Sequence, residues 1–441
     1  MKPHLKIPSS LLERALFDLE RAHPFALERV GFLSCRQASG PSGPILFCYD
    51  YHPIADEDYV QDKTCGARIG ERPIHAAMQR ILDEGAAQIW VHTHGSKWNT
   101  NPSPLDREEG PRMLRSLVNV GRNLCNGWAV ISEREATGQV WIPDHGPVLL
   151  DQFSVVGWPT IISRPSYAFH FPNGEDHHSR QGFLGDDAPR IIQQSKLGIV
   201  GLGGGGSHVN QQLAHIGFQN LVYADPDRIE RTNLNRLVGA TIDDARHSRL
   251  KVEIAERLFL SLQSDAKLDS SAAKWEEKIG ALGECDIIFG CLDGFSGRRD
   301  LEIFCRSRMI PLVDIGMKVL REEKHPPSIF GQAVVSMPGH HCLRCLNVVT
   351  EENLAREAGD YGAGPQPQVV WPNGVLASIA VGFAVQILTG WGGTAIPPYR
   401  LEFNGFEQTM TPASNLLKVL QSIPCPHFSL SDLGGARFRR L

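Results

Sequence analysis

Two groups of residues in this chain have the types and the spacing that chemistry needs. The first group lies before residue 110 and comprises Glu28, His92-Thr93-His94 and Ser103-Pro104-Leu105-Asp106. The second group follows residue 195 and combines a glycine-rich loop with spaced acidic, amide and basic residues. The first group suits hydrolysis of an amide bond, and the second suits activation of a carboxylate with ATP. A chain with both would act at the two ends of one modification cycle.

The first group matches the needs of a zinc-dependent hydrolase. Such an enzyme requires three protein ligands, an open position for water and a base that accepts the water's proton. A His-x-His pair at the end of a strand places both imidazoles on one face, because side chains alternate along a strand. His92 and His94 would be two ligands, and Asp106 from the following helix would be the third. Zinc lowers the pKa of its water toward about 7, so that a nearby carboxylate can take the proton.

Each part of this pattern has a simpler interpretation when it is taken alone. Two histidines in a loop are more often surface polar groups, and Ser103 would most simply cap the helix that holds Asp106. The ordered combination, however, resembles the JAB/MPN (JAMM) family of zinc isopeptidases, whose pattern is E-x-x-G, then H-x-H, then S-x-x-D. Here Glu28-Arg29-Val30-Gly31 supplies the first segment, and the resemblance covers residues 10 to 145.

The resemblance assigns a role to each residue of the first group. It implies that His92, His94 and Asp106 bind a catalytic zinc ion, that Glu28 is the general acid/base and that Ser103 stabilises the oxyanion. The sequence departs from the family in one place. Eight residues separate His94 from Ser103, one more than usual, and Gly95 stands where proline is common.

The second group begins with a glycine loop, residues 201–206, directly after the apolar segment 197–200. Glycines let the backbone come close to phosphates, whose charge is met by amides at the N-terminus of the following helix. With Asp225 at the end of the next apolar segment, a dinucleotide site of a dehydrogenase is the simplest interpretation. The run Asn233-Leu234-Asn235-Arg236 and Lys251 argue against it, because hydride transfer does not need them.

Acyl adenylation does need such groups. A carboxylate attacks the α-phosphate of ATP, and negative charge grows on the phosphorus and on the leaving pyrophosphate. Arg236 and Lys251 can stabilise that charge, and Asp293 can hold Mg²⁺ against the phosphates.

This part of the chain, from about residue 175 to 430, resembles the ThiF/MoeB/HesA family and the adenylation domains of ubiquitin-activating enzymes. One departure follows the run Asn233-Leu234-Asn235-Arg236, where this chain has Leu237 and the family has glutamine. The matching elements are His178-Ser179-Arg180-Gln181, the loop 201–206, Asp225-Pro226-Asp227, Asn233-Leu234-Asn235-Arg236, Lys251 and Asp293-Gly294-Phe295-Ser296-Gly297-Arg298.

The second resemblance implies roles for these residues. Asp225 would bind the ribose, Asp293 would bind Mg²⁺, and a set of three would contact phosphates: Asn233, Arg236 and Lys251. Further nucleotide contacts are expected from Gly201, Gly203, Gly204, Gly206 and Arg298. The arm arginine of the family reaches ATP in the partner subunit, so Arg180 implies a homodimer. The alternative is that Arg180 is a solvated arm residue.

Cys342-Leu343-Arg344-Cys345 is a C-x-x-C segment, which in a cytosolic chain usually means structural zinc. The family often closes this site with a second C-x-x-C, but here that place contains Cys425 followed by His427. His427 could be the fourth ligand, as could His340 or His341. An empty or rebuilt site is the alternative.

Ubiquitin-activating enzymes also need a cysteine that receives the activated protein as a thioester. Residues 346 to 372, where it usually lies, contain no cysteine. The others resemble inert packing cysteines: Cys35, Cys48, Cys65, Cys125, Cys285, Cys291 and Cys305. The chain is therefore expected to stop at the acyl-adenylate, or to pass it on by an unusual route.

Composition sets the remaining expectations. The chain has 441 residues, of which 42% are apolar and 21% charged, as in an ordinary globular protein. A net charge of -5 gives no reason to expect nucleic acid as a partner. No apolar run reaches the ~18 residues that span a bilayer, and the first residues do not resemble a signal peptide. Ten cysteines are too sparse for a disulfide scaffold and favour a reduced, cytoplasmic setting.

The alternation of strand-like and helix-like segments predicts an α/β chain with two folded parts. We expect an α+β JAB/MPN-like domain in residues 1–150 and a connector with an arm in 151–190. A Rossmann-like, doubly wound adenylation domain would occupy 191–441.

Together these patterns predict a cytoplasmic, bacterial-type fusion of a zinc isopeptidase with an adenylyltransferase that uses ATP, Mg²⁺ and Zn²⁺. The expected substrate is a small ubiquitin-like β-grasp protein ending in glycine, with a conjugating enzyme or a sulfurtransferase as a further partner. Two alternatives stay open: activation of a sulfur-carrier protein for biosynthesis, or a binding scaffold in which one site is inactive.

Overall fold

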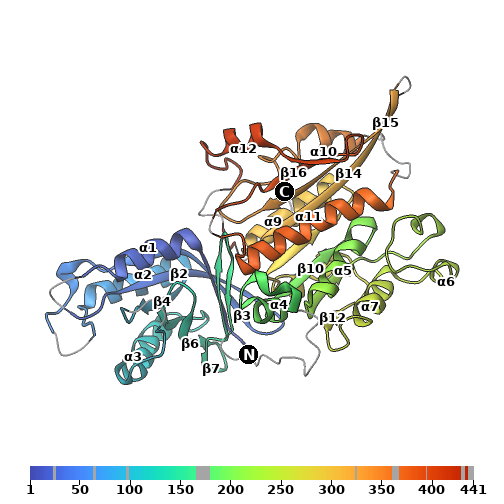
Figure 1. Ribbon diagram of the computed structural model, residues 1–441. Coiled ribbons are helices and arrows are strands. Elements are labelled where there is room, and N and C mark those ends of the chain that lie inside the picture. Colours follow the sequence, from blue (N-terminus) through green and yellow to red (C-terminus); the bar gives the residue numbers. More distant parts are fainter. Residues whose placement is uncertain are drawn as a thin grey trace. The chain divides into compact units, whose positions relative to one another are not determined.

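The structure is a computed structural model that describes residues 1–22, 26–62, 66–95, 99–164, 179–322, 325–359, 367–393, 395–428 and 433–435 (Figure 1). It contains two compact units, which we treat separately. The first comprises Met1–Tyr167, Ser307–Met309 and Leu430–Arg437, and the second comprises Ala168–Arg306, Ile310–Ser429 and Phe438–Leu441.

The first unit is built on one sheet of nine strands in the order β7-β6-β5-β4-β2-β3-β1-β8-β9. The strands are β1 (His4–Pro8), β2 (Val30–Ser39), β3 (Pro44–Pro53), β4 (Ala87–His92), β5 (Gly127–Ile131), β6 (Ala136–Ile142), β7 (Gly146–Leu149), β8 (Gln152–Val156) and β9 (Ile161–Ser163).

The predicted connector begins later than expected. Strand β8 pairs in parallel with β1, and β9 pairs with β8, so residues 152–163 belong to the sheet of the first unit rather than to a linker. All five residues of β8 are buried. The proline- and glycine-rich composition of this region concealed the short strands, because such residues predict loops.

Helices cover both faces of this sheet. Helix α1 (Ser9–Leu19) contributes its apolar side to one core, and α2 (Glu71–Glu84) and α3 (Pro104–Val120) contribute to a second core. Strand β2 runs antiparallel to β4, with Val30 opposite His92. The residues just before β2 and those just after β4 therefore meet at the same edge of the sheet.

The second unit is built on a sheet of eight strands in the order β12-β11-β10-β13-β14-β15-β16-β17. Its strands are β10 (Lys196–Val200), β11 (Asn220–Ala224), β12 (Lys267–Asp269), β13 (Ile287–Gly290), β14 (Leu312–Glu322), β15 (His325–Ser336), β16 (Arg400–Asn404) and β17 (Thr409–Pro412). Strands β12, β11, β10, β13 and β14 are neighbours in this order and are parallel, as expected for a doubly wound fold. Strands β15 to β17 extend the sheet in antiparallel fashion, which the sequence had not revealed.

The helices of the second unit are α4 (Ala188–Gln194), α5 (Gly204–Ile216), α6 (Ile242–Arg246), α7 (Lys251–Leu260), α8 (Ile279–Leu282), α9 (Phe295–Ser307), α10 (Glu351–Ala358), α11 (Val370–Thr389) and α12 (Ser414–Leu420). Figure 1 shows α11 lying along the sheet beside α5. Within the described part of the chain, α11 is the single helix long and apolar enough to cross a membrane. More than half of its apolar window is buried by α5, β14 and β15, as in the core helix of a globular unit.

Candidate functional site

A pocket of about 990 Å³ opens in the second unit at the carboxyl ends of the parallel strands. Strand β10 has β11 on one side and β13 on the other, so the order of the strands reverses at this place. In open α/β sheets, ligands bind in the crevice outside such a reversal. The pocket is lined by most of the residues expected to bind the nucleotide: Gly201, Gly203, Gly204, Asp225, Asn233, Arg236, Lys251, Asp293 and Arg298.

The glycine loop joins β10 to α5 and forms one wall of the pocket. Gly201 has φ of +92°, which favours glycine, and a Cβ atom on Gly203 would meet nothing within 4 Å. Gly206 does not line the pocket, contrary to expectation. A Cβ atom there would lie 1.9 Å from the carbonyl oxygen of Gly201, so this glycine permits the tight turn into α5.

Asp225 lies at the end of β11 and holds the loop in place. Its Oδ2 accepts a hydrogen bond from the backbone N–H of Leu202 at 2.6 Å, and its Oδ1 accepts one from that of Asp227 at 2.8 Å. Burial raises the pKa of the Asp225 carboxyl, while the charge of Lys251 lowers it. The Lys251 ammonium donates to Asp227 at 2.7 Å and lies 4.0 Å from Asp225. This ammonium group and the two carboxylates therefore lie side by side at the pocket.

Asn233, Arg236 and Asp293 supply polar groups from other segments. The Oδ1 of Asn233 accepts from the backbone N–H of Glu230, and the Arg236 guanidinium donates to the carbonyl of Thr232. Asp293 is exposed at the pocket and accepts a hydrogen bond from Gln368 at 3.2 Å. An exposed carboxylate in a pocket that Arg236 and Lys251 also line suits a phosphate-bound divalent cation.

Arg298 lines the pocket, but its guanidinium is directed into the protein. It donates to Asp314 on β14 and to the carbonyl oxygen of Leu292, and the residue is almost fully buried. Burial raises the pKa of Asp314 to about 6 in spite of the opposing effect of Arg298. The Arg298 guanidinium thus supports the Asp293 loop, and its expected nucleotide contact stays a prediction.

Arg180 does not line this pocket. It is exposed on the 3-10 helix Ser179–Leu184, and His178 of the same predicted arm lies outside the described residues.

Sequence reasoning missed several pocket residues because they lie outside any motif. Lys318 comes from β14, and three more lie on one side of α10 at a spacing of three and four residues: Asn353, Arg356 and Glu357. That spacing is the signal that could have identified them, since residues three or four apart share a helix face. Glu357 accepts a hydrogen bond from the backbone N–H of Ser296, which joins α10 to the first turn of α9.

The first unit brings together His92, His94 and Asp106, with one donor atom from each within 4.8 Å of the others. We call these three residues the His/Asp cluster. The Nε2 of His92 lies 3.0 Å from Oδ1 of Asp106, and that of His94 lies 2.9 Å from Oδ2. All three side chains are at most 10% exposed, and neither ring nitrogen of His92 makes a hydrogen bond.

Such buried, unpaired ring nitrogens beside a carboxylate fit a metal. Two imidazoles and one carboxylate form the donor set of a catalytic zinc ion that keeps an open position. A bound ion would give the buried Nε2 of His92, which faces Asp106, a ligand bond in place of a hydrogen bond.

Glu28 lies near this cluster because the residues before β2 meet those after β4. Burial raises the pKa of its carboxyl, and the charges of His92 and His94 act in the opposite direction. The neighbouring Arg29 is almost fully buried and pairs with Asp56, which anchors the segment. A carboxyl with a raised pKa beside a zinc site is suited to general acid/base work.

Ser103 is the N-cap of α3, which is its simplest role. Its hydroxyl accepts from the Asp106 N–H, and its own N–H donates to Oδ2 of Asp106 at 2.7 Å. This capping box orients the third candidate ligand. Gly95 has φ of +67°, a conformation that proline cannot adopt, so the departure from the family pattern has a backbone cause.

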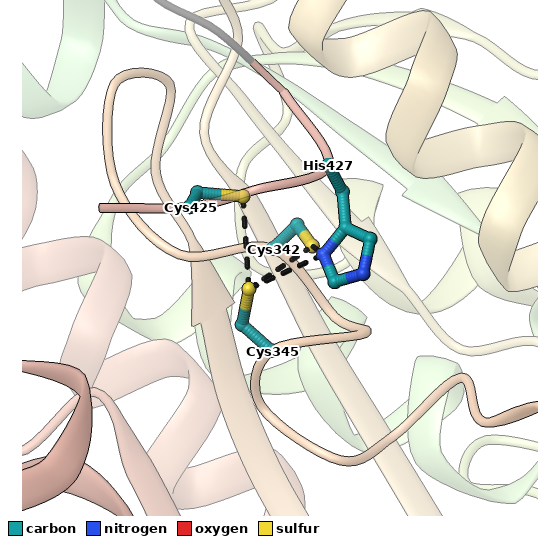
Figure 2. Close-up of side chains that lie close together, drawn as sticks. All are labelled: Cys342, Cys345, Cys425 and His427. Atoms are coloured by element: carbon teal, nitrogen blue, oxygen red, sulfur yellow. Dashed lines mark hydrogen bonds between the residues drawn. The ribbon is translucent and has the colours of Figure 1, made fainter. Parts of the chain in front are cut away.

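Cys342, Cys345, Cys425 and His427 form the second cluster, which we call the Cys/His cluster (Figure 2). The distances are 3.7 Å from Cys342 to Cys345 and 3.6 Å from Cys345 to Cys425. The Nδ1 of His427 lies 3.3 and 3.4 Å from the sulfurs of Cys342 and Cys345. Zn–S bonds of about 2.3 Å in a tetrahedron give S···S edges of about 3.8 Å, so the donor set fits structural zinc.

The other candidates for the fourth ligand are excluded by their positions. His341 donates its Nε2 proton to the carbonyl oxygen of Ile423 at 2.8 Å and stacks on Tyr399. Among the described residues, His427 and not His340 lies with the three cysteines. Hydrogen bonding from Cys342 lowers the pKa of the Cys425 thiol to about 3, which favours a thiolate at this place.

The remaining cysteines of the described chain give no sign of a nucleophile. Cys291 lines the nucleotide pocket, but burial and the charge of Asp314 raise the pKa of its thiol. A thiol that stays protonated is a poor nucleophile. Cys65 lies outside the described residues.

The comparison with known proteins identifies the class of the second unit. The sequence profile of the ThiF family matches residues 177–419, and the chain belongs to that family.

Three relatives are similar to it over this part. The molybdopterin-synthase adenylyltransferase of Escherichia coli (strain K12) is 28% identical over 213 residues, which are 47% of this chain and 79% of that protein. The sulfur carrier protein ThiS adenylyltransferase of the same organism is 28% identical over 220 residues, 48% of this chain and 81% of that protein. The SAMP-activating enzyme E1 of Haloferax volcanii is 29% identical over 176 residues, 39% of this chain and 61% of that protein.

Among solved structures, MccB of E. coli in complex with N-formylated MccA covers 54% of this chain and 72% of its own, at 20% identity and a TM-score of 0.46.

Proposed function

We propose that the second unit is an adenylyltransferase that activates the C-terminal carboxylate of a small ubiquitin-like or sulfur-carrier protein. One observation carries the proposal: the pocket of a ThiF-family fold gathers Asp225, Arg236, Lys251 and Asp293 around a glycine loop. The names of the relatives support the reaction class, since two of them are adenylyltransferases and one is an activating enzyme.

The residues divide the work of binding and charge stabilisation. The loop amides at the N-terminus of α5 would receive the phosphates, and Asp225 would bind the ribose hydroxyls. Arg236 and Lys251 would stabilise the charge that develops as the substrate carboxylate attacks the α-phosphorus and pyrophosphate leaves. Asp293 would hold Mg²⁺, which neutralises phosphate charge when it is bound.

Exchange of pyrophosphate into ATP tests this function. The wild type should catalyse exchange only with a glycine-ending β-grasp protein, taken from a panel that includes ThiS. Asp293→Ala should lower the rate by on the order of a hundredfold, whereas Asp265→Ala, which changes an exposed aspartate outside the pocket, should not. Equal exchange by Asp293→Ala and the wild type would show that the site is assigned wrongly.

We infer a second activity for the first unit: zinc-dependent cleavage after the terminal glycine of the same small protein. The support is the buried His/Asp cluster, with Glu28 beside it and Ser103 fixing Asp106. His92, His94 and Asp106 would hold zinc, which supplies an activated water when bound. Glu28 would take and return the proton, and Ser103 would stabilise the oxyanion.

The two activities together describe a processing and activation protein. The first unit would trim a precursor or release the modifier from targets, and the second would activate the exposed carboxylate. The same proposal includes a homodimer, in which Arg180 reaches the nucleotide of the partner subunit. It also includes a conjugating enzyme or a sulfurtransferase as the next partner, and a cytoplasmic location. The competing proposal is a scaffold with one inactive site, which would bind the modifier without turning it over.

A further inference from the structure

One face of α9 carries a row of buried charges that the proposed reaction does not use. Arg298, Glu302 and Arg306 follow each other at intervals of four residues, so their side chains share one side of the helix. Each residue is at most 5% exposed. Charged groups are rarely buried so deeply unless they are paired with other polar groups.

The first member of the row supports the nucleotide pocket. Arg298 binds Asp314 and the carbonyl oxygen of Leu292, the residue before Asp293. Phe295 and Ser296, which begin the same helix, line the pocket. The position of α9 therefore fixes the backbone that presents the candidate Mg²⁺ ligand.

The other two members bind the segments that carry the Cys/His cluster shown in Figure 2. Glu302 accepts a hydrogen bond from the backbone N–H of Leu343, between the first two cysteines, at 2.7 Å. Arg306 donates to the carbonyl of His341 at 3.0 Å, and its guanidinium lies 4.7 Å from the ring of Phe428. These three partners are each adjacent in sequence to a residue of the cluster.

The hydroxyl of Ser336 joins the two charges. It donates to Glu302 at 2.5 Å and accepts from Arg306 at 2.8 Å, while the Arg306 Nε lies 3.6 Å from the Glu302 carboxylate. An ordered chain of contacts thus runs from the cluster, through Ser336 and α9, to the Asp293 loop. The Nε atoms of Arg298 and Arg306 make no hydrogen bond, so the connection depends on the few contacts named above. Loss of any one of these contacts would leave a buried charged group without its partner.

We propose that Glu302 and Arg306 are positioning residues that couple metal binding at the Cys/His cluster to nucleotide binding. The inference rests on the proposed function, since it concerns the same nucleotide pocket. Coupling of two sites is reciprocal in their equilibrium affinities, so metal should improve nucleotide affinity by the same factor by which nucleotide improves metal affinity.

The experiment measures zinc release and nucleotide affinity in the full chain. All proteins carry His92→Ala, so that the released zinc comes from the Cys/His cluster. Zinc transfer to a coloured chelator is followed with and without Mg²⁺ and the non-hydrolysable analogue AMPCPP, and the affinity for AMPCPP is measured by calorimetry. The variants are Ser336→Ala, which keeps both charges, and Glu302→Gln, which keeps an acceptor for Leu343.

Glu351→Gln is the matched control. Glu351 pairs with Arg344 inside the C-x-x-C segment, at 2.6 Å, but it is exposed and lies on α10 rather than α9. This variant removes one carboxylate next to the cluster without touching the buried row.

We expect saturating AMPCPP to slow zinc release from the parent protein by about fivefold or more. Ser336→Ala and Glu302→Gln should lose this protection and bind AMPCPP more weakly, while Glu351→Gln behaves as the parent. The inference is overturned if folded variants release zinc faster yet keep the parent's nucleotide affinity and protection. No AMPCPP binding by the parent itself would contradict the inference and the proposed function together.

Discussion

Single residues determine which chemistry each cluster can support. The Cys/His cluster offers three sulfurs and one nitrogen, all within 4.8 Å, which fill a tetrahedron and leave no open position. The His/Asp cluster offers two nitrogens and one oxygen, which leave room for water. If both clusters bind zinc as proposed, the donor types favour a structural role for the Cys/His cluster and a catalytic role for the His/Asp cluster.

Metal content tests this division. The purified chain should hold about two zinc ions, and His92→Ala should lose one of them with little change in thermal stability. Cys342→Ser should lose the other and lower the unfolding temperature, because structural zinc contributes folding free energy directly. Elemental analysis and thermal unfolding provide the measurements. One zinc ion per chain, unaffected by His92→Ala, would rule out the N-terminal site.

Residue types and order alone predicted most of both candidate sites. The structure places His92, His94 and Asp106 together, and it places His427 rather than His340 or His341 beside the three cysteines. Gly206 does not line the nucleotide pocket, whereas Arg298 lines it but directs its guanidinium to Asp314. Arg298 was assigned to the nucleotide from its place in a motif, but its partner Asp314 lies on a distant strand and could not be found from spacing.

At the scale of secondary structure elements, register and turns position these residues. The pairing of Val30 with His92 explains how Glu28 comes near histidines more than sixty residues away in the sequence. The tight turn at residues 201–206 aims the N-terminus of α5 at the pocket.

The glycine turn makes a prediction about stability. In Gly206→Ala, the new methyl group would collide with a backbone oxygen, and the variant should lose about 2 kcal/mol or more of unfolding free energy. Gly203→Ala is the control, because its methyl group enters open space, and it should keep the stability of the wild type. Denaturant unfolding of both variants checks the difference. Equal stabilities would mean that the turn differs from the one described.

The elements that the sequence did not reveal share a physical reason. Strands β8 and β9 are short and lie among turn-forming residues, and β15 to β17 depend on pairing partners far along the chain. Their stability comes from the sheet they join, whereas local patterns report only local preferences.

At the scale of the whole molecule, the central claim is that two independent activities serve one small protein. Glu28 lies in the first unit and Lys251 in the second, and the residues proposed for each reaction come from one unit alone. Each variant should therefore remove one activity and spare the other.

The substitutions Glu28→Ala and Lys251→Ala test this separation. Glu28→Ala should abolish cleavage after the terminal glycine and leave adenylation near the wild-type rate. Lys251→Ala should keep cleavage and lose on the order of a hundredfold in pyrophosphate exchange. Loss of both activities in either variant, with the fold intact, would contradict two independent sites.

Intact-mass spectrometry of the modifier tests the central claim most directly. A β-grasp precursor with residues beyond its glycine, and the same protein trimmed to the glycine, are each incubated with ATP, Mg²⁺ and the enzyme. The wild type should convert both into the adenylate of the trimmed form, because adenylation needs a free carboxylate. Glu28→Ala should adenylate only the trimmed protein, and Lys251→Ala should trim the precursor without adenylating it. If Glu28→Ala adenylates both forms equally, the first unit is not a maturation protease and the account is contradicted.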